Sequence, residues 1–286
     1  YWYGVIIASG ILLALLFCSK QAKKYGLTED DIYDTALWAI PFAIVGARLY
    51  YVVFYLDIYR RADGSLDFPA MVRIWDGGLA IYGGVIAGVI GIYVLCRVKK
   101  IKIGALLDVV ALGFLIGQSL GRWGNFFNRE AFGAATDSFL RMGLYLTADG
   151  SFSYEMHYFH PTFLYESLWN IVGFVALHFL SKKRRYDGQI ALGYVAWYGL
   201  GRALIEGLRM DSLYWGPFRV SQVLAAVSCV AAVSVLLWNS FRAHDPKDLL
   251  VNQVAEKEAA KAEPAEAESV EEAPVEEVTV EAAEEE

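Results

Sequence analysis

The chain has 286 residues, of which 56% are hydrophobic and 20% are charged, and its mean hydropathy is +0.37. These values exclude an ordinary soluble domain and predict a membrane protein. The formal net charge is −7, but residues 245–286 hold fifteen acidic residues against three lysines, which leaves +5 on the remainder. A mildly basic body suits membrane lipid of negative charge. No stretch has the basic, aromatic-interleaved pattern of a nucleic-acid binder, so we expect no nucleic-acid partner.

The apolar residues gather in runs long enough to cross a membrane. A transmembrane helix needs about 20 apolar residues to cross a hydrocarbon core of about 30 Å. Such runs occur at roughly 1–18, 34–55, 78–96, 104–121, 162–180, 188–206 and 220–238. They predict an all-α polytopic membrane protein with seven transmembrane helices, which form one membrane domain over residues 1–242.

The short loops between these runs differ in basic charge. Loops after the first, third and fifth runs carry eleven lysine and arginine residues, whereas the other short loops carry five. Because basic loops stay in the cytoplasm, we expect the N-terminus outside and the C-terminus in the cytoplasm.

Two segments lie outside the apolar runs. The connection at about 122–161 is long and rich in aromatic residues, and we expect it to form a small extracytoplasmic head, because loops of that length usually have a function. Residues 243–286 are rich in alanine, glutamate and valine and predict a disordered acidic tail. Since this tail lacks apolar anchors, its removal after Lys247 is expected to leave activity intact.

Cysteine and histidine residues give little indication of metal chemistry. Cys18, Cys96 and Cys229 each lie in an apolar run without paired spacing, which indicates small buried hydrophobic residues. His157 and His160 lie close in sequence, but no third strong ligand follows at a recognisable spacing. We therefore expect no metal site.

Several ionisable residues fall at the same depth of the predicted membrane domain. At about 1.5 Å per helical residue, Arg202 lies about 21 Å from the cytoplasmic start of its run, and Arg48 lies about 10 Å below the outer end of its own. Arg122 closes the outer end of the fourth run. Further candidates at outer ends are Tyr3, Tyr82, His160, Tyr165 and Glu166. Intramembrane charges usually mark function, so this convergence predicts a partly wet cavity that faces the outer leaflet.

Tyr198, Arg202 and Glu206 follow one another at intervals of four residues, which places them on one helical face. The pair Arg202 and Glu206 has two interpretations. It is either a structural ion pair or a pair that orients Arg202 for catalysis.

Glycines around Tyr82 also have two interpretations. Small residues let membrane helices pack closely, and we accept that interpretation for Gly88 and Gly91. For Gly83 and Gly84 we expect that they shape the cavity wall or let lipid approach the backbone.

The stretch Gly121–Gly133, GRWGNFFNREAFG, concentrates polar groups at a membrane boundary. Its polar members are Arg122, Asn125, Asn128 and Glu130. An isolated arginine and carboxylate could simply extend to water, but the added amides and the flanking glycines favour a site for a polar head group. This block resembles the signature of the bacterial prolipoprotein diacylglyceryl transferases.

The resemblance covers roughly residues 1–238 and includes Trp2–Gly4, Gly46–Arg48, Arg73–Gly78, His160–Glu166 and Tyr198–Glu206. It implies a seven-helix bundle with a small extracytoplasmic head in a bacterial plasma membrane. It also implies an enzyme, without cofactor, that transfers diacylglycerol from phosphatidylglycerol to the lipobox cysteine of prolipoproteins. By this resemblance Arg122 and Arg202 hold and activate the lipid phosphate. Supporting positions are Tyr3, Asn125, Glu130, Glu166, Tyr198 and Glu206.

One residue departs from the family pattern. Family members often carry histidine where this chain has Tyr82, so the proton acceptor stays open, with Glu206, directly or through Tyr82, as the preferred candidate. The full set of expected catalytic residues is Arg122, Arg202, Glu206 and Tyr82. The expected substrate-binding residues are Tyr3, Arg48, Asn125, Asn128, Glu130, Glu166, Tyr198, Gly83 and Gly84.

The expected chemistry is attack of a thiolate on the glycerol carbon that bears the phosphodiester, with release of glycerol 1-phosphate. The leaving phosphate gains charge, so paired arginines would favour the transition state. The alternative is a transporter or flippase for an anionic lipid or solute. A transporter should show internal repeats or paired broken helices, which we do not find in the sequence.

Overall fold

The computed structural model describes residues 2–61, 63–147, 149–210 and 214–271. Within them, six helices are long and apolar enough to cross a membrane: α1 (Trp2–Gln21, continued by the 3₁₀ helix η1, Ala22–Tyr25), α2 (Glu29–Phe54), α4 (Ile81–Lys99), α5 (Ile103–Asn128), α6 (Thr162–Ser181) and α8 (Val220–Ser240). The prediction of an all-α polytopic membrane protein is confirmed at this level.

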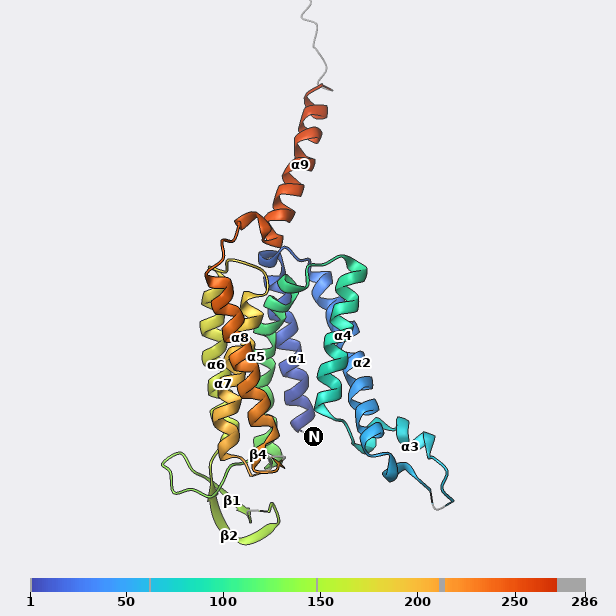
Figure 1. Cartoon of the computed structure of the whole chain (residues 1–286), viewed down its shortest axis with the longest axis vertical. Coiled ribbons are helices and arrows are strands. Elements are labelled where there is room, and N and C mark those ends of the chain that lie inside the picture. Colours follow the sequence, from blue (N-terminus) through green and yellow to red (C-terminus); the bar gives the residue numbers. More distant parts are fainter. Residues whose placement is uncertain (1, 62, 148, 211–213, 272–286) are drawn as a thin grey trace, which may run out of the picture.

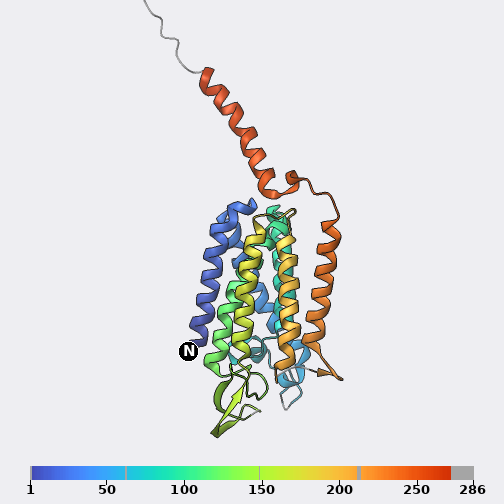
Figure 2. The same ribbon diagram turned by 90° about the vertical axis from the view of Figure 1, so that its left-hand side faces the viewer.

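Helix α7 (Gln189–Ile205) has 17 residues and runs beside α6 and α8 (Figures 1 and 2). Its length is about 26 Å at 1.5 Å per residue, slightly less than a typical hydrocarbon core. The sixth predicted span, 188–206, corresponds to this helix.

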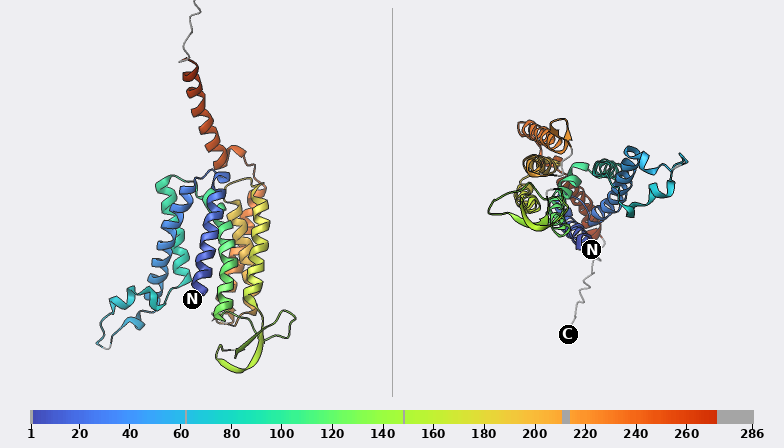
Figure 3. Two further views of the ribbon diagram at one scale, coloured as in Figure 1. Left: turned by 180° about the vertical axis from the view of Figure 1, so that it is seen from behind. Right: turned by 90° about the horizontal axis from the view of Figure 1, so that it is seen from below.

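The helices form two groups that meet at α1. Helix α2 packs on α4, while α5 contacts α1, α6 and α7, and α7 in turn packs on α8 (Figure 3). Helix α5 is the most enclosed of the long helices, with Ala105, Leu106, Val109 and Leu112 fully buried. Its position explains why a polar residue at its end, such as Arg122, can meet side chains from several neighbours.

One end of the bundle, which we call the head end, carries the N-terminus and the connections outside the long helices (Figure 1). The antiparallel strands β1 (Met142–Leu146) and β2 (Phe152–Phe159) pair Met142 with Phe159. Strands β3 (Tyr214–Trp215) and β4 (Phe218–Arg219) form a second short hairpin. An arm between α2 and α4 contains η2 (Leu56–Tyr59), α3 (Phe68–Val72) and η3 (Ile74–Asp76).

The opposite end, which we call the tail end, is organised by local capping and by the C-terminal segment. Thr28 starts α2 with a capping box, since its hydroxyl accepts from the Asp31 amide at 3.1 Å and the Asp31 carboxylate accepts from the Thr28 amide at 3.0 Å. Helix α2 therefore begins at Glu29, ahead of the apolar run that the sequence predicts.

The C-terminal segment continues through η5 (Pro246–Asp248) into α9 (Leu250–Glu271), which projects from the tail end (Figure 1). Leu250 packs against the buried cluster that contains Ala22 and Tyr25, and its amide donates to the Asp187 carboxylate at 2.9 Å. The expectation that this segment lacks apolar anchors is therefore wrong. The structure has a helix over Leu250–Glu271, where we expect disorder. Residues 272–286 lie outside the described residues, and a disordered tail there stays a prediction.

The cysteines follow the sequence prediction in part. Cys18 and Cys96 are buried at 4% exposure, as small hydrophobic residues would be, whereas Cys229 on α8 is half-buried.

Candidate active site

Glu166, near the head end of α6, lies at the centre of a group of charges. One carboxylate oxygen lies 2.6 Å from Arg122 Nη2, and the other lies 3.1 Å from Arg202 Nη1 and 3.1 Å from Arg209 Nη1. Only 5% of the Glu166 side chain is exposed. Helices α5, α6 and α7 are thus joined at their head ends by one carboxylate.

Glu206 supplies a second buried carboxylate at the start of η4 (Glu206–Leu208). Its Oε2 lies 2.7 Å from Arg202 Nη2 and 4.0 Å from Arg209 Nε. We call Arg122, Glu166, Arg202, Glu206 and Arg209 the arginine–glutamate cluster. Buried charges need partners, and in this cluster each carboxylate contacts at least two arginines.

The three arginines differ in access. The side chains of Arg122 and Arg202 are 20% and 18% exposed, whereas that of Arg209 is 9% exposed. An incoming anion can therefore reach Arg122 and Arg202, while Arg209 mainly supports the two carboxylates. Paired guanidinium groups are well suited to phosphate or carboxylate oxygens.

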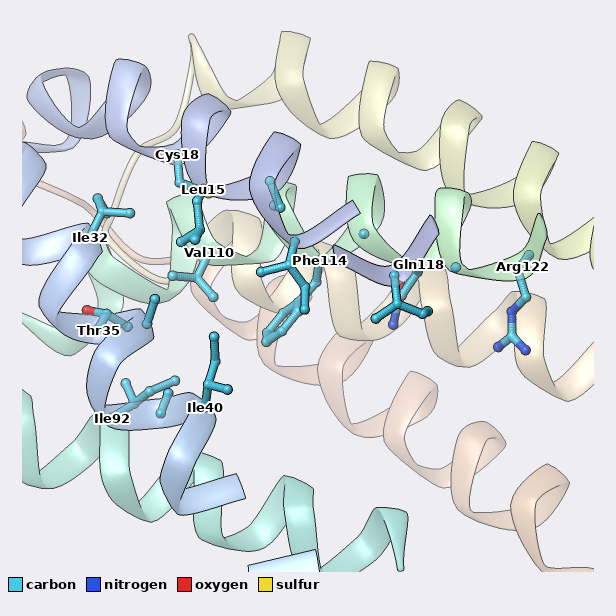
Figure 4. Close-up of a pocket in the computed structure, with 18 of the residues that line it drawn as sticks. Leu15, Cys18, Ile32, Thr35, Ile40, Ile92, Val110, Phe114, Gln118 and Arg122 are labelled. Carbon is cyan, nitrogen blue, oxygen red and sulfur yellow. The ribbon is translucent and has the colours of Figure 1, made fainter. Parts of the chain in front are cut away.

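A cavity of about 580 Å³ starts at Arg122 and extends toward the tail end between α1, α2 and α5 (Figure 4). Arg122 and Gln118 lie at one end of it, and Cys18, Ile32 and Ile92 lie toward the other. Along α5 it runs from Val110 to Asn125, which is about 22 Å of helix. A cavity that is charged at one end and apolar along its length suits an amphiphile with an anionic head.

Tyr3 and Asn125 line the charged end of this cavity. The Tyr3 ring packs on Gly124, where a Cβ would lie 2.8 Å from Tyr3 Cδ2, so only glycine leaves room for the ring. Asn125 and Asn128 both donate from Nδ2 to Glu130 Oε1, at 2.9 and 3.4 Å. Three members of the predicted polar block, Asn125, Asn128 and Glu130, are therefore connected, and Glu130 orients the Asn125 amide beside the cavity.

Tyr198 is half-buried on α7, and its ring stacks on Tyr194 with centroids 5.8 Å apart. The Tyr194 hydroxyl accepts from Gln118 Nε2 at 2.8 Å, and Gln118 lines the cavity. Tyr198 is thus connected to the cavity through Tyr194 and Gln118.

Arg48 has a different role from the substrate binding that we expected. It is 7% exposed and donates to the carbonyl oxygens of Ala70, Met71, Arg73, Gly77 and Gly78 at 2.5–2.9 Å. These bonds use all five N–H groups of the guanidinium. We therefore reassign Arg48 to holding the arm between α2 and α4, because no donor is left for a substrate.

Gly83 also has a packing role in place of the expected lipid contact. A Cβ there would lie 2.3 Å from Tyr50 Cβ and 2.4 Å from the Gly46 carbonyl oxygen, so this glycine lets α4 approach α2. At Gly84 a Cβ would lie 3.3 Å from the Ala43 carbonyl oxygen, so this glycine also faces α2, in a looser contact.

Tyr82 lies in the first turn of α4, whereas the cluster is built from α5, α6, α7 and η4. A proton relay through Tyr82 stays a prediction.

The two histidines of the head end contact hydroxyl groups. His157 Nε2 lies 3.2 Å from Ser153 Oγ, and His160 Nδ1 lies 3.3 Å from the Tyr165 hydroxyl. Among the described residues, no group of three or more histidine, cysteine, aspartate or glutamate side chains is placed to hold a metal ion.

Arg209 is a member of the cluster that the sequence did not single out, since it stands among the charges of the short loops. The available signal is spacing, since Arg209 follows Arg202 by seven residues and Glu206 by three, which in a continuous helix would place it on the same face. Its contact with Glu166 could not be read from spacing, because Glu166 belongs to another helix.

Together, the fold and the site define a polytopic membrane protein whose candidate site joins arginines and buried glutamates to an apolar cavity at one end of the bundle. The sequence model of one family, described as prolipoprotein diacylglyceryl transferase, matches residues 1–238. The chain belongs to the prolipoprotein diacylglyceryl transferase family.

Curated relatives agree with this assignment. The chain is 43% identical over 253 residues to the phosphatidylglycerol–prolipoprotein diacylglyceryl transferase of Listeria monocytogenes serotype 4a, an alignment that covers 86% of this chain and 87% of the relative. It is 43% identical over 241 residues to the enzyme of that name from Limosilactobacillus reuteri (83% and 86% covered). It is 42% identical over 263 residues to that of Enterococcus faecalis (90% and 92% covered). These comparisons give no support to a transporter or flippase.

Proposed function

We propose that this protein transfers the diacylglyceryl group of phosphatidylglycerol to the thiol of the lipobox cysteine in prolipoproteins. The observation that carries the proposal is the pair of guanidinium groups of Arg122 and Arg202, joined by Glu166, at the polar end of an apolar cavity that Arg122 lines. Phosphatidylglycerol has one phosphate and two apolar chains, which match these two features. The names of the relatives specify the same donor and acceptor.

Arg122 and Arg202 bind the phosphate in this proposal. Glu166 holds both guanidinium groups, at 2.6 and 3.1 Å, and so sets the distance between them. The thiolate attacks the glycerol carbon that bears the phosphodiester, a sulfur–carbon bond forms, and the carbon–oxygen bond breaks with its electron pair on the phosphate oxygen. The products are the thioether and glycerol 1-phosphate. The arginines favour the transition state because charge increases on the oxygens that they contact.

The thiol proton needs an acceptor, because a free cysteine has a pKa near 8.5. Glu206 is the nearest candidate to Arg202, with its Oε2 at 2.7 Å from the guanidinium. Its role as acceptor, directly or through Tyr82, is part of the proposal. Asn125, Asn128 and Glu130 bind the lipid head group, with Tyr3 at the same end of the cavity.

The proposal includes a topology in which α7 also crosses the membrane, which makes seven spans in all, and the head end faces the outer leaflet. Support comes from the basic loops, since the loops after α1, α4 and α6 all lie at the tail end beside α9 (Figure 1). Cysteines placed at Glu155 and Lys183 test this arrangement with an impermeant thiol reagent. We expect modification at 155 in intact cells and at 183 only after permeabilisation, and the reverse pattern would refute the orientation.

The central experiment uses the full chain in lipid nanodiscs with phosphatidylglycerol and a lipobox peptide. We expect a peptide mass increased by one diacylglyceryl group and release of glycerol phosphate in equal amounts. A peptide with serine in place of the lipobox cysteine is the control and should give neither product. Lipid movement across vesicles without peptide modification would favour the transporter alternative and refute the proposal.

A further inference from the structure

Next to the arginine–glutamate cluster, on the side of the tail end, α5 and α6 are joined by a reciprocal pair of serines. Ser167 Oγ donates to the Ser119 carbonyl oxygen at 3.0 Å, and Ser119 Oγ donates to the Ser167 carbonyl oxygen at 3.3 Å. Both side chains are buried, at 1% and 8% exposure. Trp123 Nε1 also donates to Ser167 Oγ, at 3.2 Å.

Helices α6 and α7 are joined in the same manner by two tryptophans. Trp169 Nε1 donates to the Trp197 carbonyl oxygen at 2.9 Å, and Trp197 Nε1 donates to the Trp169 carbonyl oxygen at 2.9 Å. Their rings stack with centroids 4.4 Å apart and an interplanar angle of 19°. Two side chains and two backbone groups are thus connected in one closed arrangement.

A glycine faces each tryptophan and makes the arrangement possible. A Cβ at Gly173 would lie 2.3 Å from Trp197 Nε1, and a Cβ at Gly201 would lie 2.2 Å from Trp169 Nε1. Each glycine follows the tryptophan of its own helix by four residues, so both helices carry the pattern Trp-x-x-x-Gly. Any larger residue would push the indole away from its carbonyl acceptor.

These two pairs lie next to the charges of the site along the chain. Ser119 precedes Arg122 by three residues, which is about 4.5 Å along a helix. Ser167 directly follows Glu166, and Gly201 directly precedes Arg202. The three helices that are tied together are therefore the three that supply Arg122, Glu166 and Arg202.

Membrane helices need such ties, because lipid tails are as apolar as leucine and burial alone does little to hold helices in one register. Arg122 and Arg202 contact opposite oxygens of one carboxylate. A small shift of α7 against α6 would therefore change the separation of the two guanidinium groups. A displacement of about 1 Å in a catalytic group can lower a rate by about 10²-fold.

We propose that Trp169 and Trp197, supported by the serine pair, are positioning residues that set the spacing of Arg122 and Arg202 around the lipid phosphate. The proposal rests on the proposed function. It assigns no contact with substrate to either tryptophan. The tryptophans act through Glu166 and Arg202, whose ion pair they hold in register.

The test compares Trp169→Phe, Trp197→Phe and the double variant with Trp38→Phe as the matched control. Phenylalanine keeps an aromatic ring and removes the N–H donor. Trp38 lies on α2, is 48% exposed and has its ring centroid 5.8 Å from that of Phe42, so its substitution should leave turnover unchanged. Turnover in nanodiscs is measured with the lipobox peptide and is normalised to folded protein by size-exclusion chromatography.

We expect each single variant to lower kcat by about 10-fold or more, with less than a threefold change in KM for phosphatidylglycerol. The double variant should lose about as much as either single variant, because the two bonds act as one unit. Gly201→Ala should show the same division between kcat and KM, since it displaces the indole of Trp169 and leaves both tryptophans present.

Three results would overturn the proposal. They are wild-type kcat in both folded tryptophan variants, a rise in KM without a fall in kcat, and a loss of folded protein with normal kcat in the folded fraction. The last would show that the tryptophans only stabilise the bundle. If the wild-type protein transferred no lipid under these conditions, the proposed function itself would fail, and the two failures are distinguishable for that reason.

Discussion

Glu166→Gln is the substitution whose consequences the structure defines best. It keeps the shape of the side chain and removes the charge that contacts Arg122, Arg202 and Arg209. Among the described residues of the cluster, Glu206 would then be the remaining carboxylate near the guanidinium groups. We expect loss of stability, loss of turnover and an increased dependence on bound anion.

The size of the effect follows from burial. A unit pair 3 Å apart interacts by about 5 kcal/mol at an effective dielectric of 20, and removing one partner of a buried pair costs about 3–5 kcal/mol. Because Arg122 and Arg202 are 20% and 18% exposed, water screens part of this interaction, and we expect the lower end of that range. A loss of about 3 kcal/mol corresponds to a decrease in Tm of about 6–12 °C for a chain of this size.

The measurement is thermal unfolding in nanodiscs of neutral lipid, with and without added phosphatidylglycerol. The lipid should raise the Tm of the Glu166→Gln variant more than that of the wild type, because its phosphate replaces part of the missing negative charge. The control is Glu155→Gln, which changes an exposed carboxylate of β2 and should alter stability by less than about 0.5 kcal/mol. An unchanged Tm for Glu166→Gln would refute the assignment of Glu166 as the centre of the cluster.

Three further predictions concern the arginines, the proton acceptor and the C-terminal segment. Arg122→Lys and Arg202→Lys keep the charge but lose the planar fork, so turnover should fall by about 10²-fold and lipid binding by much less; near-normal turnover in both would remove them from the mechanism. Tyr82→His should retain activity, whereas Tyr82→Phe should lose about 10²-fold if the hydroxyl relays a proton, and full turnover by folded Tyr82→Phe would make Tyr82 a packing residue. Truncation after residue 247 should lower stability by about 2 kcal/mol, because it removes Leu250 from the buried cluster and the amide that donates to the Asp187 carboxylate. Truncation after residue 258 is the control, and equal stability of the two truncated chains would show that Leu250 anchors nothing.

The sequence by itself determined the class of the protein and the helical face that carries Arg202 and Glu206. Hydropathy is a local property that accumulates residue by residue, so the apolar runs correspond to the long helices α1, α2, α4, α5, α6 and α8. Helical periodicity is equally local, and the ion pair of Arg202 and Glu206 at 2.7 Å follows from a spacing of four residues. Asn125, Asn128 and Glu130 of the polar block likewise form a connected group because they are close in sequence.

Tertiary structure decided which partners each of these polar residues contacts. Arg48 and Arg202 look alike in sequence, as arginines inside apolar runs, yet Arg48 donates to five carbonyl oxygens of the arm while Arg202 contacts Glu166 and Glu206. Glu166 became the centre of the cluster, and Trp169 and Trp197 became partners, through the packing of α6 on its neighbours. The physical reason is that a side chain's partner depends on which helix lies beside it, and helix neighbours are set by close packing between segments far apart in the chain.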